Sequence, residues 1–230
     1  MTPQAVMIFA AGLGTRMGAL TRDRPKPLIE VAGRPLIDHA LALARAAGIP
    51  RVVVNTHAHA EQLRAHLARV APEALVSHEP VLLETGGGLK QALALLGPGP
   101  VFTLNSDVVW TGANPLRALV AAWVPGTGAL LALVPRSAAQ GHGGPGDFLR
   151  DPGGRLVRRG EATAADYVYA GAQIIDPATV AAVPDAAFSL NPVWDGMIAE
   201  GRLRGLVHPG GWVDVGRPEG IALAEAELAR

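Results

Sequence analysis

The sequence predicts an α/β fold with a Rossmann-like, mixed but mostly parallel sheet flanked by helices. Two observations carry this prediction: short apolar runs alternate with segments of helical periodicity, and 49% of the residues are hydrophobic against 17% charged. This composition is typical of a compact core, and 230 residues are enough to build one. Because neither a linker nor a repeat divides the chain, we expect one domain over residues 1–230, with a regular half at 1–134 and a less regular half at 135–230.

The regular half contains strands that read as continuous apolar runs, which is typical of buried parallel strands. We expect these strands at residues 5–10, 51–55, 74–77, 101–105 and 128–134. Between them, apolar residues at helical spacing predict helices at 34–49, 59–70, 89–96 and 114–123. The alternation implies parallel pairing through right-handed crossovers.

The less regular half begins after Val134 with a loop. A hairpin that turns at DPGG should follow, then a long strand, a helix that begins near Pro192, two short strands and a last helix. These elements are expected at residues 148–157, 167–175, 189–201, 203–208, 211–216 and 217–229.

Charge and composition exclude several classes of function. Twenty basic and twenty acidic residues give a net charge of zero without a Lys/Arg cluster, so no nucleic-acid partner is expected. The absence of cysteine excludes disulfides and thiolate zinc sites. No apolar run approaches the roughly 20 residues of a membrane helix, and a strand that starts by Ala5 leaves no room for a signal peptide. We expect a cytoplasmic protein with no membrane partner.

The first strand ends in FAAGLGTRMG, whose glycines Gly12, Gly14 and Gly18 match neither the G-x-G-x-x-G fingerprint nor a P-loop. Taken alone, this segment is a tight turn that contains Arg16. Further along, Lys26 lies between two prolines that restrict the backbone on both sides of it. Glycines let backbone N–H groups approach phosphate closely, and the two cations supply fixed positive charge. Together they predict a polyphosphate-binding loop.

Two stretches, AAGLGTRM at 10–17 and RPKPLIEVAGRPLI at 24–37, resemble the signature of sugar-1-phosphate nucleotidyltransferases of the glucose-1-phosphate thymidylyltransferase type. The resemblance covers nearly the whole chain and implies the nucleotide-diphospho-sugar transferase fold, with a nucleotide-binding half at 1–134 and a sugar-binding half at 135–230. It departs at Ala19, where most relatives have proline, so a looser loop is expected there.

The implied reaction transfers a nucleotidyl group from a nucleoside triphosphate to a sugar 1-phosphate and releases pyrophosphate. Arg16 would bind the leaving pyrophosphate, and Lys26 the α-phosphate or the incoming sugar phosphate. The nucleotide site implied by the resemblance consists of Ala10, Ala11, Gly12, Leu13, Gly14, Thr15, Arg16, Lys26, Glu84, Thr85, Gly86 and Gly87.

Two aspartates are candidates for a metal site. Asp107 follows the apolar strand at 101–105, where a helix cap or a turn residue is the alternative interpretation. Asp214 lies between two valines on a predicted strand, and a buried charge there needs a partner. The family has its two magnesium-binding aspartates at the matching positions, so the resemblance implies that Asp107 and Asp214 bind Mg²⁺.

The segment EPVLLETGGGLKQAL at 79–93 is predicted to be a loop that leads into a helix. A plain flexible connection is one interpretation. Its LETGGG stretch is most similar to N-acetylmuramate-1-phosphate uridylyltransferases, which implies UTP and N-acetyl-α-muramate 1-phosphate as substrates and a step in peptidoglycan recycling. The resemblance implies that this loop reads the nucleobase through backbone groups, as the matching loop does in relatives. The sugar contacts implied by the second half and by the strand at 101–105 are Asn105, Asp147, Gly171 and Asn191, with Trp194 in core packing.

Three alternatives stay open. One is a guanylyltransferase for mannose 1-phosphate or a heptose phosphate. Another is an inactive binding or regulatory module, although Arg16, Lys26, Asp107 and Asp214 are all present. The last, an NAD-binding oxidoreductase, is disfavoured by the glycine spacing and by Asn55, which stands where such a fold needs an acidic residue. Because the β-helix tail of many oligomeric relatives is lacking, we expect a monomer.

Overall fold

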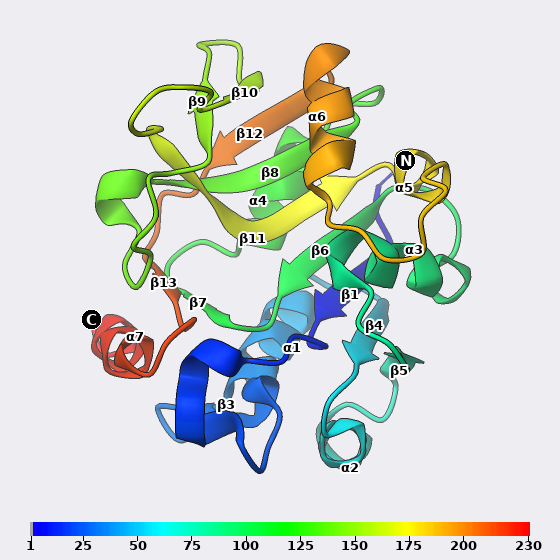
Figure 1. The fold of residues 1–230 in the computed structure, drawn as a ribbon, viewed down its shortest axis with the longest axis vertical. Coiled ribbons are helices and arrows are strands. Elements are labelled where there is room, and N and C mark those ends of the chain that lie inside the picture. The colour runs from blue at the N-terminus through cyan, green and yellow to red at the C-terminus, as the bar shows by residue number, and fades with distance from the viewer. Residues whose placement is uncertain (1) are drawn as a thin grey trace.

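The computed structural model describes residues 2–230 and has a nine-stranded central sheet in the order β10-β9-β11-β6-β1-β4-β5, with β8 paired to β11 and β12 paired to β8. Its first half is entirely parallel, β1 pairing with both β4 and β6, and β4 with β5. The strands of this half are β1 (Ala5–Phe9), β4 (Arg51–Thr56), β5 (Leu75–His78) and β6 (Val101–Asn105). They form the lower part of the sheet in Figure 1.

The second half of the sheet is built around one antiparallel strand. β11 pairs antiparallel with both β6 and β8, so β8 runs in the same direction as β6. β12 is parallel to β8, and the β9–β10 hairpin extends the sheet beyond β11. These strands are β8 (Ala129–Pro135), β9 (Phe148–Arg150), β10 (Leu156–Arg158), β11 (Tyr167–Ile175) and β12 (Leu203–Val207). The predicted mixed, mostly parallel sheet is confirmed, but β8 does not pair with β6 as the alternation implied, because β11 is inserted between them.

Helices cover both faces of the sheet because successive strand residues point to opposite sides. Val6 and Ile8 pack with α1, α2 and α4 in one cluster, whereas Ala5 and Met7 pack with α3, α5 and α6 in another. The helices are α1 (Leu36–Ala46), α2 (Ala60–Val70), α3 (Glu84–Leu96), α4 (Pro115–Ala122), α5 (Pro177–Ala181), α6 (Asn191–Ala199) and α7 (Glu219–Leu228). Each layer therefore has its own apolar core.

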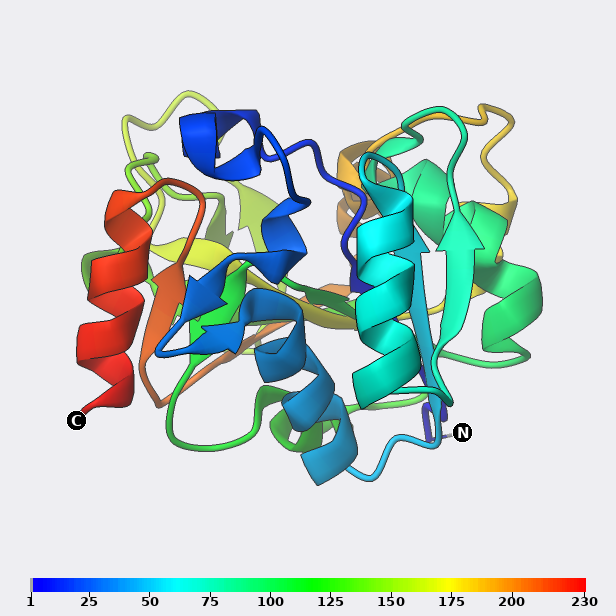
Figure 2. The ribbon, with the colours of Figure 1, turned by 90° about the horizontal axis from the view of Figure 1, so that it is seen from below.

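A third apolar cluster joins segments that are far apart in the sequence. Met17, Val109, Val213 and Ala224 are buried together in it, beside β7, β13 and α7. Figure 2 shows α7 at one end of the molecule, and β5 and α3 at the other. The glycine-rich loop after β1, residues 10–18, is called the phosphate loop after its predicted role. The short elements in this region are η1 (Thr15–Thr21), η2 (Lys26–Leu28), β2 (Glu30–Val31), β3 (Arg34–Pro35), β7 (Val108–Trp110), η3 (Arg136–Ala138) and β13 (Trp212–Asp214). The cluster fixes the phosphate loop beside β7 and β13.

Several element boundaries differ from the sequence expectation. α3 begins at Glu84 instead of residue 89, so the run of glycines forms its first turns. Helix α1 begins at Leu36 because the two preceding residues pair as β3. The short β7 and α5 were not anticipated, because three apolar residues and a five-residue helix give no usable periodicity.

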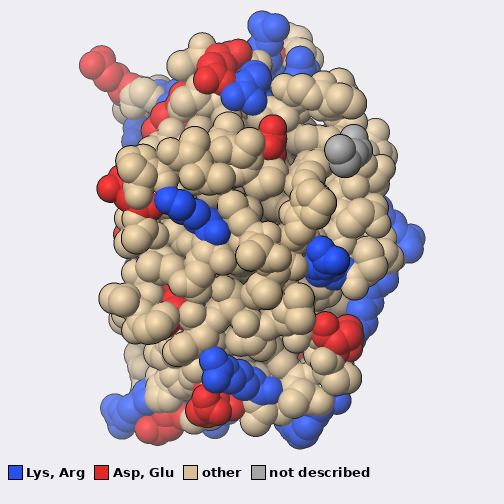
Figure 3. Space-filling model, turned by 90° about the vertical axis from the view of Figure 1, so that its right-hand side faces the viewer, with Lys and Arg blue, Asp and Glu red and all other residues tan. Residues whose placement is uncertain are grey.

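The surface drawn in Figure 3 carries charges of both signs, interspersed among uncharged residues. This side of the molecule therefore carries no large patch of a single sign. Within residues 2–230, none of the helices is both long and apolar enough to span a bilayer.

Candidate active site

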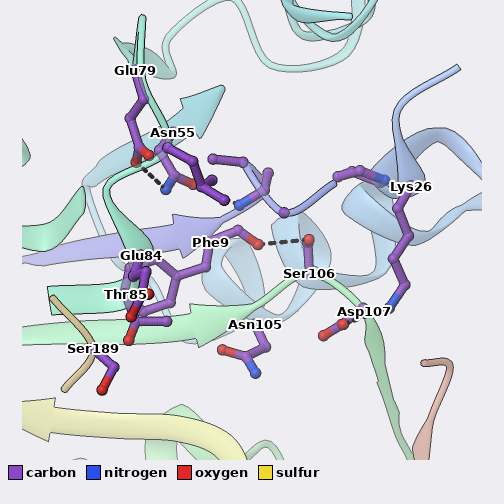
Figure 4. A pocket seen from close by; sticks show the side chains of 15 residues that line it. Phe9, Lys26, Asn55, Glu79, Glu84, Thr85, Asn105, Ser106, Asp107 and Ser189 are labelled. Carbon is purple, nitrogen blue, oxygen red and sulfur yellow. Dashed lines mark hydrogen bonds and ion pairs between the residues drawn. The ribbon is translucent and has the colours of Figure 1, made fainter. Parts of the chain in front are cut away.

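The carboxyl ends of β1, β4 and β6 open onto a cavity of about 330 Å³, the position where ligands bind in open α/β sheets. Figure 4 shows its side chains converging from β1, β4, β6, the start of α3 and the Lys26 segment. Eight of the predicted nucleotide, catalytic, metal and sugar residues line it: Ala10, Ala11, Gly12, Lys26, Glu84, Thr85, Asn105 and Asp107. The structure thus brings segments that are distant along the chain together around one cavity.

The phosphate loop leaves β1 at Ala10, whose N–H donates to the Asn55 side-chain oxygen at 2.6 Å. Gly14 has a φ of +65°, and a Cβ there would lie 2.9 Å from the Cβ of Lys26, so only glycine lets the loop pass this side chain. Leu13 is 48% exposed, and Thr15 and Arg16 continue into η1. These last residues lie outside the cavity wall and extend the site toward β13.

Lys26 is held as the flanking prolines predict. The residue is only 7% exposed, and its Nζ lies 2.6 Å from Asp107 Oδ2. Pro25 is extended and Pro27 opens the short η2 turn. A buried ammonium beside a half-buried carboxylate gives a fixed ion pair in the cavity wall.

Asp107 and Asp214 are brought together by the β7–β13 pair, in which Asp214 is opposite Val108. Burial raises the pKa of the Asp214 carboxyl, and the negative charge of Asp107 adds to this, while Lys26, Arg16 and His142 oppose it. A Cβ on Gly216 would lie 2.9 Å from Asp214 Oδ1 and 3.2 Å from Arg16 Nη2. Two carboxylates and two basic side chains therefore meet beyond the end of β6.

The start of α3 forms another wall of the cavity. Glu84 has a φ of +59°, uncommon for a residue other than glycine, and Thr85 Oγ1 accepts a hydrogen bond from Leu190 N at 3.0 Å. Gly86 and Gly87 were expected to contact a nucleobase through their backbone. Their N–H groups instead both donate to the Phe188 carbonyl, at 2.8 and 3.0 Å, and neither residue lines the cavity. Their contact with a nucleobase stays a prediction, and the structure shows that the glycines leave room for the segment that contains Phe188.

A buried polar network, which the sequence reasoning did not find, connects the loop to α3. Asn55 Nδ2 donates to Glu79 Oε1 at 2.7 Å, and Glu79 Oε2 accepts from Leu83 N at 3.0 Å. Glu79 is fully buried, and Gly88 leaves room for its carboxylate, since a Cβ there would lie 2.5 Å from Oε1. The sequence did signal Asn55, a polar residue after three valines near the end of β4, whereas it gave no signal for Glu79.

A second cavity of about 280 Å³ adjoins the first and shares Phe9, Thr85 and Asn105 with it. Of the expected sugar contacts, Asn105, Asp147 and Asn191 line this cavity. Asp147 Oδ2 accepts a hydrogen bond from Tyr169 N at 2.8 Å, which leaves Oδ1 for other partners. Gly171 lies in the irregular part of β11, and a Cβ there would lie 3.0 Å from the Asn105 side chain.

Three further residues of this region were not predicted as site residues. Arg158 and Tyr169 line the second cavity, and Trp194, expected in core packing, is 7% exposed and both packs in the core and lines the cavity. The Tyr169 hydroxyl is buried without a hydrogen-bond partner among residues 2–230, as is Nε2 of His142. Burial raises the pKa of Tyr169, so its hydroxyl keeps its proton and can donate. Arg158, Tyr169 and Trp194 come from separate elements, so the fold and not their spacing in the sequence brings them together.

Comparisons with known proteins agree with this geometry. The family model described as "MobA-like NTP transferase domain" matches residues 6–143. The chain is 44% identical to an N-acetylmuramate alpha-1-phosphate uridylyltransferase of Caulobacter vibrioides, over 99% of this chain and 98% of the relative. It is 34% identical to the enzyme of that name from Neisseria meningitidis, over 91% and 92% of the two chains.

The fold is also that of the inositol-1-phosphate CTP transferase of T. maritima, with a TM-score of 0.81 at 15% identity, over 100% of this chain and 98% of that one. The family resemblance carried by the two phosphate-loop stretches and the predicted fold class are both confirmed. The cavity at the ends of the parallel strands is the place where such a fold binds its substrates. The chain belongs to the MobA-like NTP transferase family and is a sugar-phosphate nucleotidyltransferase.

Proposed function

We propose that the protein transfers a uridylyl group from UTP to N-acetyl-α-muramate 1-phosphate, forming UDP-N-acetylmuramate and pyrophosphate, a step in peptidoglycan recycling. The pair of adjoining cavities carries this proposal: Lys26 and Asp107 line the first, and Asn105 belongs to both. The chain-long similarity to two uridylyltransferases supports the same pair of substrates. We further propose a monomer, since residues of one chain line both cavities, that acts in the cytoplasm, where nucleoside triphosphates are available.

The sugar phosphate is already an anionic nucleophile, so the reaction needs no general base. One of its phosphate oxygens attacks the α-phosphorus of UTP, the bond from that phosphorus to the oxygen bridging to the β-phosphate breaks, and pyrophosphate leaves in line. The protein contributes position and neutralisation of negative charge. Lys26 would bind the α-phosphate or the incoming phosphate, and Arg16 the leaving pyrophosphate. Lys26 then exchanges its contact with Asp107 for the substrate phosphate.

The residues near Asp107 fit a divalent metal ion, and we propose Mg²⁺ held by Asp107 and Asp214. Each supplies hard oxygen donors, and the two carboxylates are near enough that, besides burial, the negative charge of Asp107 raises the pKa of Asp214. Within residues 2–230, no group of three or more His, Cys, Asp or Glu could hold an ion alone, so phosphate oxygens and water would complete the shell, as is typical of Mg²⁺. The bound ion would neutralise charge on the reacting phosphates.

The remaining roles follow from the cavity walls. Asn105, Asp147 and Asn191 are proposed to hydrogen-bond sugar hydroxyls, and Gly171 lets β11 approach Asn105. Tyr169 adds a buried donor. UTP would occupy the first cavity, in contact with residues of the phosphate loop and of the start of α3: Ala10, Ala11, Gly12, Leu13, Gly14, Thr15, Glu84 and Thr85.

A panel of nucleoside triphosphates against sugar 1-phosphates, followed by pyrophosphate release in the presence of Mg²⁺, tests the proposal. We expect the highest kcat/KM with UTP and N-acetyl-α-muramate 1-phosphate. Turnover of GTP with mannose 1-phosphate but not of UTP would overturn the substrate pair. An absence of pyrophosphate release with every pair would favour an inactive binding module.

A further inference from the structure

Arg158 is the cationic side chain among the residues that line the second cavity, and Asp147 is the acidic one. Lys26 and Asp107, by contrast, line only the first cavity. The proposed function accounts for the phosphate end of the substrate, but it gives no role to a guanidinium in the sugar cavity. A sugar ring with only hydroxyl and amide groups can accept hydrogen bonds from a guanidinium, but it offers no negative charge to pair with it.

The guanidinium of Arg158 rests on a rigid aromatic platform. Its central carbon lies 4.8 Å from the centre of the fully buried Phe148 ring and 5.7 Å from that of Trp194. The Trp194 indole N–H donates to Gln173 Oε1 at 3.0 Å, and Gln173 donates to Thr103 Oγ1 at 3.1 Å. Because this polar chain is buried against the sheet, the platform fixes where the positive charge lies.

Arg158 also keeps hydrogen-bonding capacity toward the cavity. Its Nε donates to Asp195 Oδ1 at 2.7 Å, and its Nη2 donates to the carbonyl and side-chain oxygens of Asn191 at 3.1 and 3.0 Å. Its Nη1 has no partner among residues 2–230, although it can donate two hydrogen bonds. The side chain is 32% exposed, so a ligand in the cavity can reach it.

We infer that Arg158 binds a carboxylate on the sugar and makes the enzyme select an acidic sugar 1-phosphate. The inference rests on the proposed function: N-acetylmuramate differs from N-acetylglucosamine by a lactyl ether that carries one carboxylate. The substrate is then held by its phosphate beside Lys26 and by its carboxylate on Arg158, with Asn105 between the two cavities. The two N–H groups of Nη1 can donate to this carboxylate, and such charge-assisted hydrogen bonds give selectivity as well as affinity.

A purely structural role is the competing explanation. In this explanation Arg158 serves only to fasten β10 to α6, through its hydrogen bonds to Asn191 and its ion pair with Asp195, whose side chain is 56% exposed. An exposed ion pair of this kind contributes little to stability. The two explanations make different predictions for Asp195→Asn, because this variant breaks the same ion pair but leaves the cation of Arg158 in the cavity.

The test measures how strongly Arg158 and the substrate carboxylate are coupled. N-acetyl-α-muramate 1-phosphate is compared with its lactyl methyl ester, which keeps the bulk of the group but not its charge, at saturating UTP and Mg²⁺. For the wild-type protein we expect kcat/KM to be about 10- to 100-fold higher for the acid than for the ester, the range for a hydrogen-bonded ion pair. This ratio should approach one in Arg158→Met, stay high in Asp195→Asn, and recover in part in Arg158→Lys.

Each outcome decides between the explanations, with the thermal unfolding of every variant as the folding control. A ratio that Arg158→Met leaves unchanged overturns the inference, and so does a ratio that Asp195→Asn abolishes to the same extent. Both results would leave the proposed function standing, because the wild-type protein would still convert the acid. If the wild-type protein turns over neither sugar phosphate with UTP, the proposed function itself fails and the role of Arg158 fails with it.

Discussion

Gly171 offers a sharp test of how the sheet shapes the second cavity, which we propose binds the sugar. Its φ is +84°, and an added Cβ would lie 3.0 Å from Cβ, Cγ and Nδ2 of Asn105. Asn105 lines both cavities, so a displacement of its side chain changes the junction between the two cavities. Gly171→Ala should therefore reduce both stability and sugar-phosphate binding.

The loss of stability expected for Gly171→Ala has two parts, the backbone strain at positive φ and the contact with Asn105, and substitutions at matched glycines separate them. An alanine at positive φ costs about 1–2 kcal/mol, which for a chain of this size is a fall of about 2–8 °C in Tm. Gly201 has a φ of +66° with nothing within 4 Å of its Cβ position, so Gly201→Ala carries the backbone strain alone. Gly196, in α6, also has open space around it. Gly196→Ala should stabilise by about 0.5–1 kcal/mol, since alanine is the better helix former.

Differential scanning fluorimetry on the three variants, with steady-state kinetics, gives the comparison. We expect the order of Tm to be Gly196→Ala, wild type, Gly201→Ala and then Gly171→Ala, and a raised KM for the sugar phosphate in the last variant alone. If Gly171→Ala and Gly201→Ala melt at the same temperature and have the same KM, the contact with Asn105 does not shape the site.

Three further predictions follow from the same geometry. Lys26→Ala should lower kcat by roughly 10²- to 10³-fold, the cost of losing one charge-stabilising group, with an unchanged circular dichroism spectrum; near-normal turnover would contradict its role. Chelation of divalent metal should stop pyrophosphate release and excess Mg²⁺ should restore it, with a higher Mg²⁺ requirement in Asp107→Asn; turnover in EDTA would contradict the metal site. Burial lowers the pKa of His208 below its usual 6.5, so the unfolded chain binds a proton that the folded chain does not. The stability that this histidine contributes is present above pH 6.5 and is lost as the pH falls through the window below it. Urea unfolding at pH 7.5 and 5.5 should show a smaller difference for His208→Gln than for the wild type.

The sequence was informative wherever the signal was local. Apolar runs located the strands of the parallel half, and the two prolines predicted that Lys26 is held in place. The pairing of Asp107 with Asp214 was beyond such reasoning, because it depends on the register of β7 and β13 and on an apolar cluster contributed by distant segments. Only the family resemblance implied it.

Non-local contacts also explain what was missed. The insertion of β11 between β6 and β8 is a choice of topology that leaves no periodicity behind. Arg158 belongs to a short hairpin strand and Trp194 to a helix, and nothing in the sequence says that one lies over the ring of the other. Residues that act in a site as neighbours from separate elements cannot be read from spacing along the chain.

The triple glycine of α3 has a structural reason that the sequence did not reveal. Its glycines admit protein: a Cβ on Gly87 would lie 2.2 Å from the Ala186 carbonyl oxygen, and one on Gly88 would meet the Glu79 carboxylate. Their absence of side chains lets the segment before α6 approach the start of α3, where Thr85 binds Leu190 N. Thr85 lines both cavities, so this contact fastens the second cavity to the first. The motif therefore sets the relative position of the two cavities, and an in-line transfer between substrates bound there, as we propose, would depend on it.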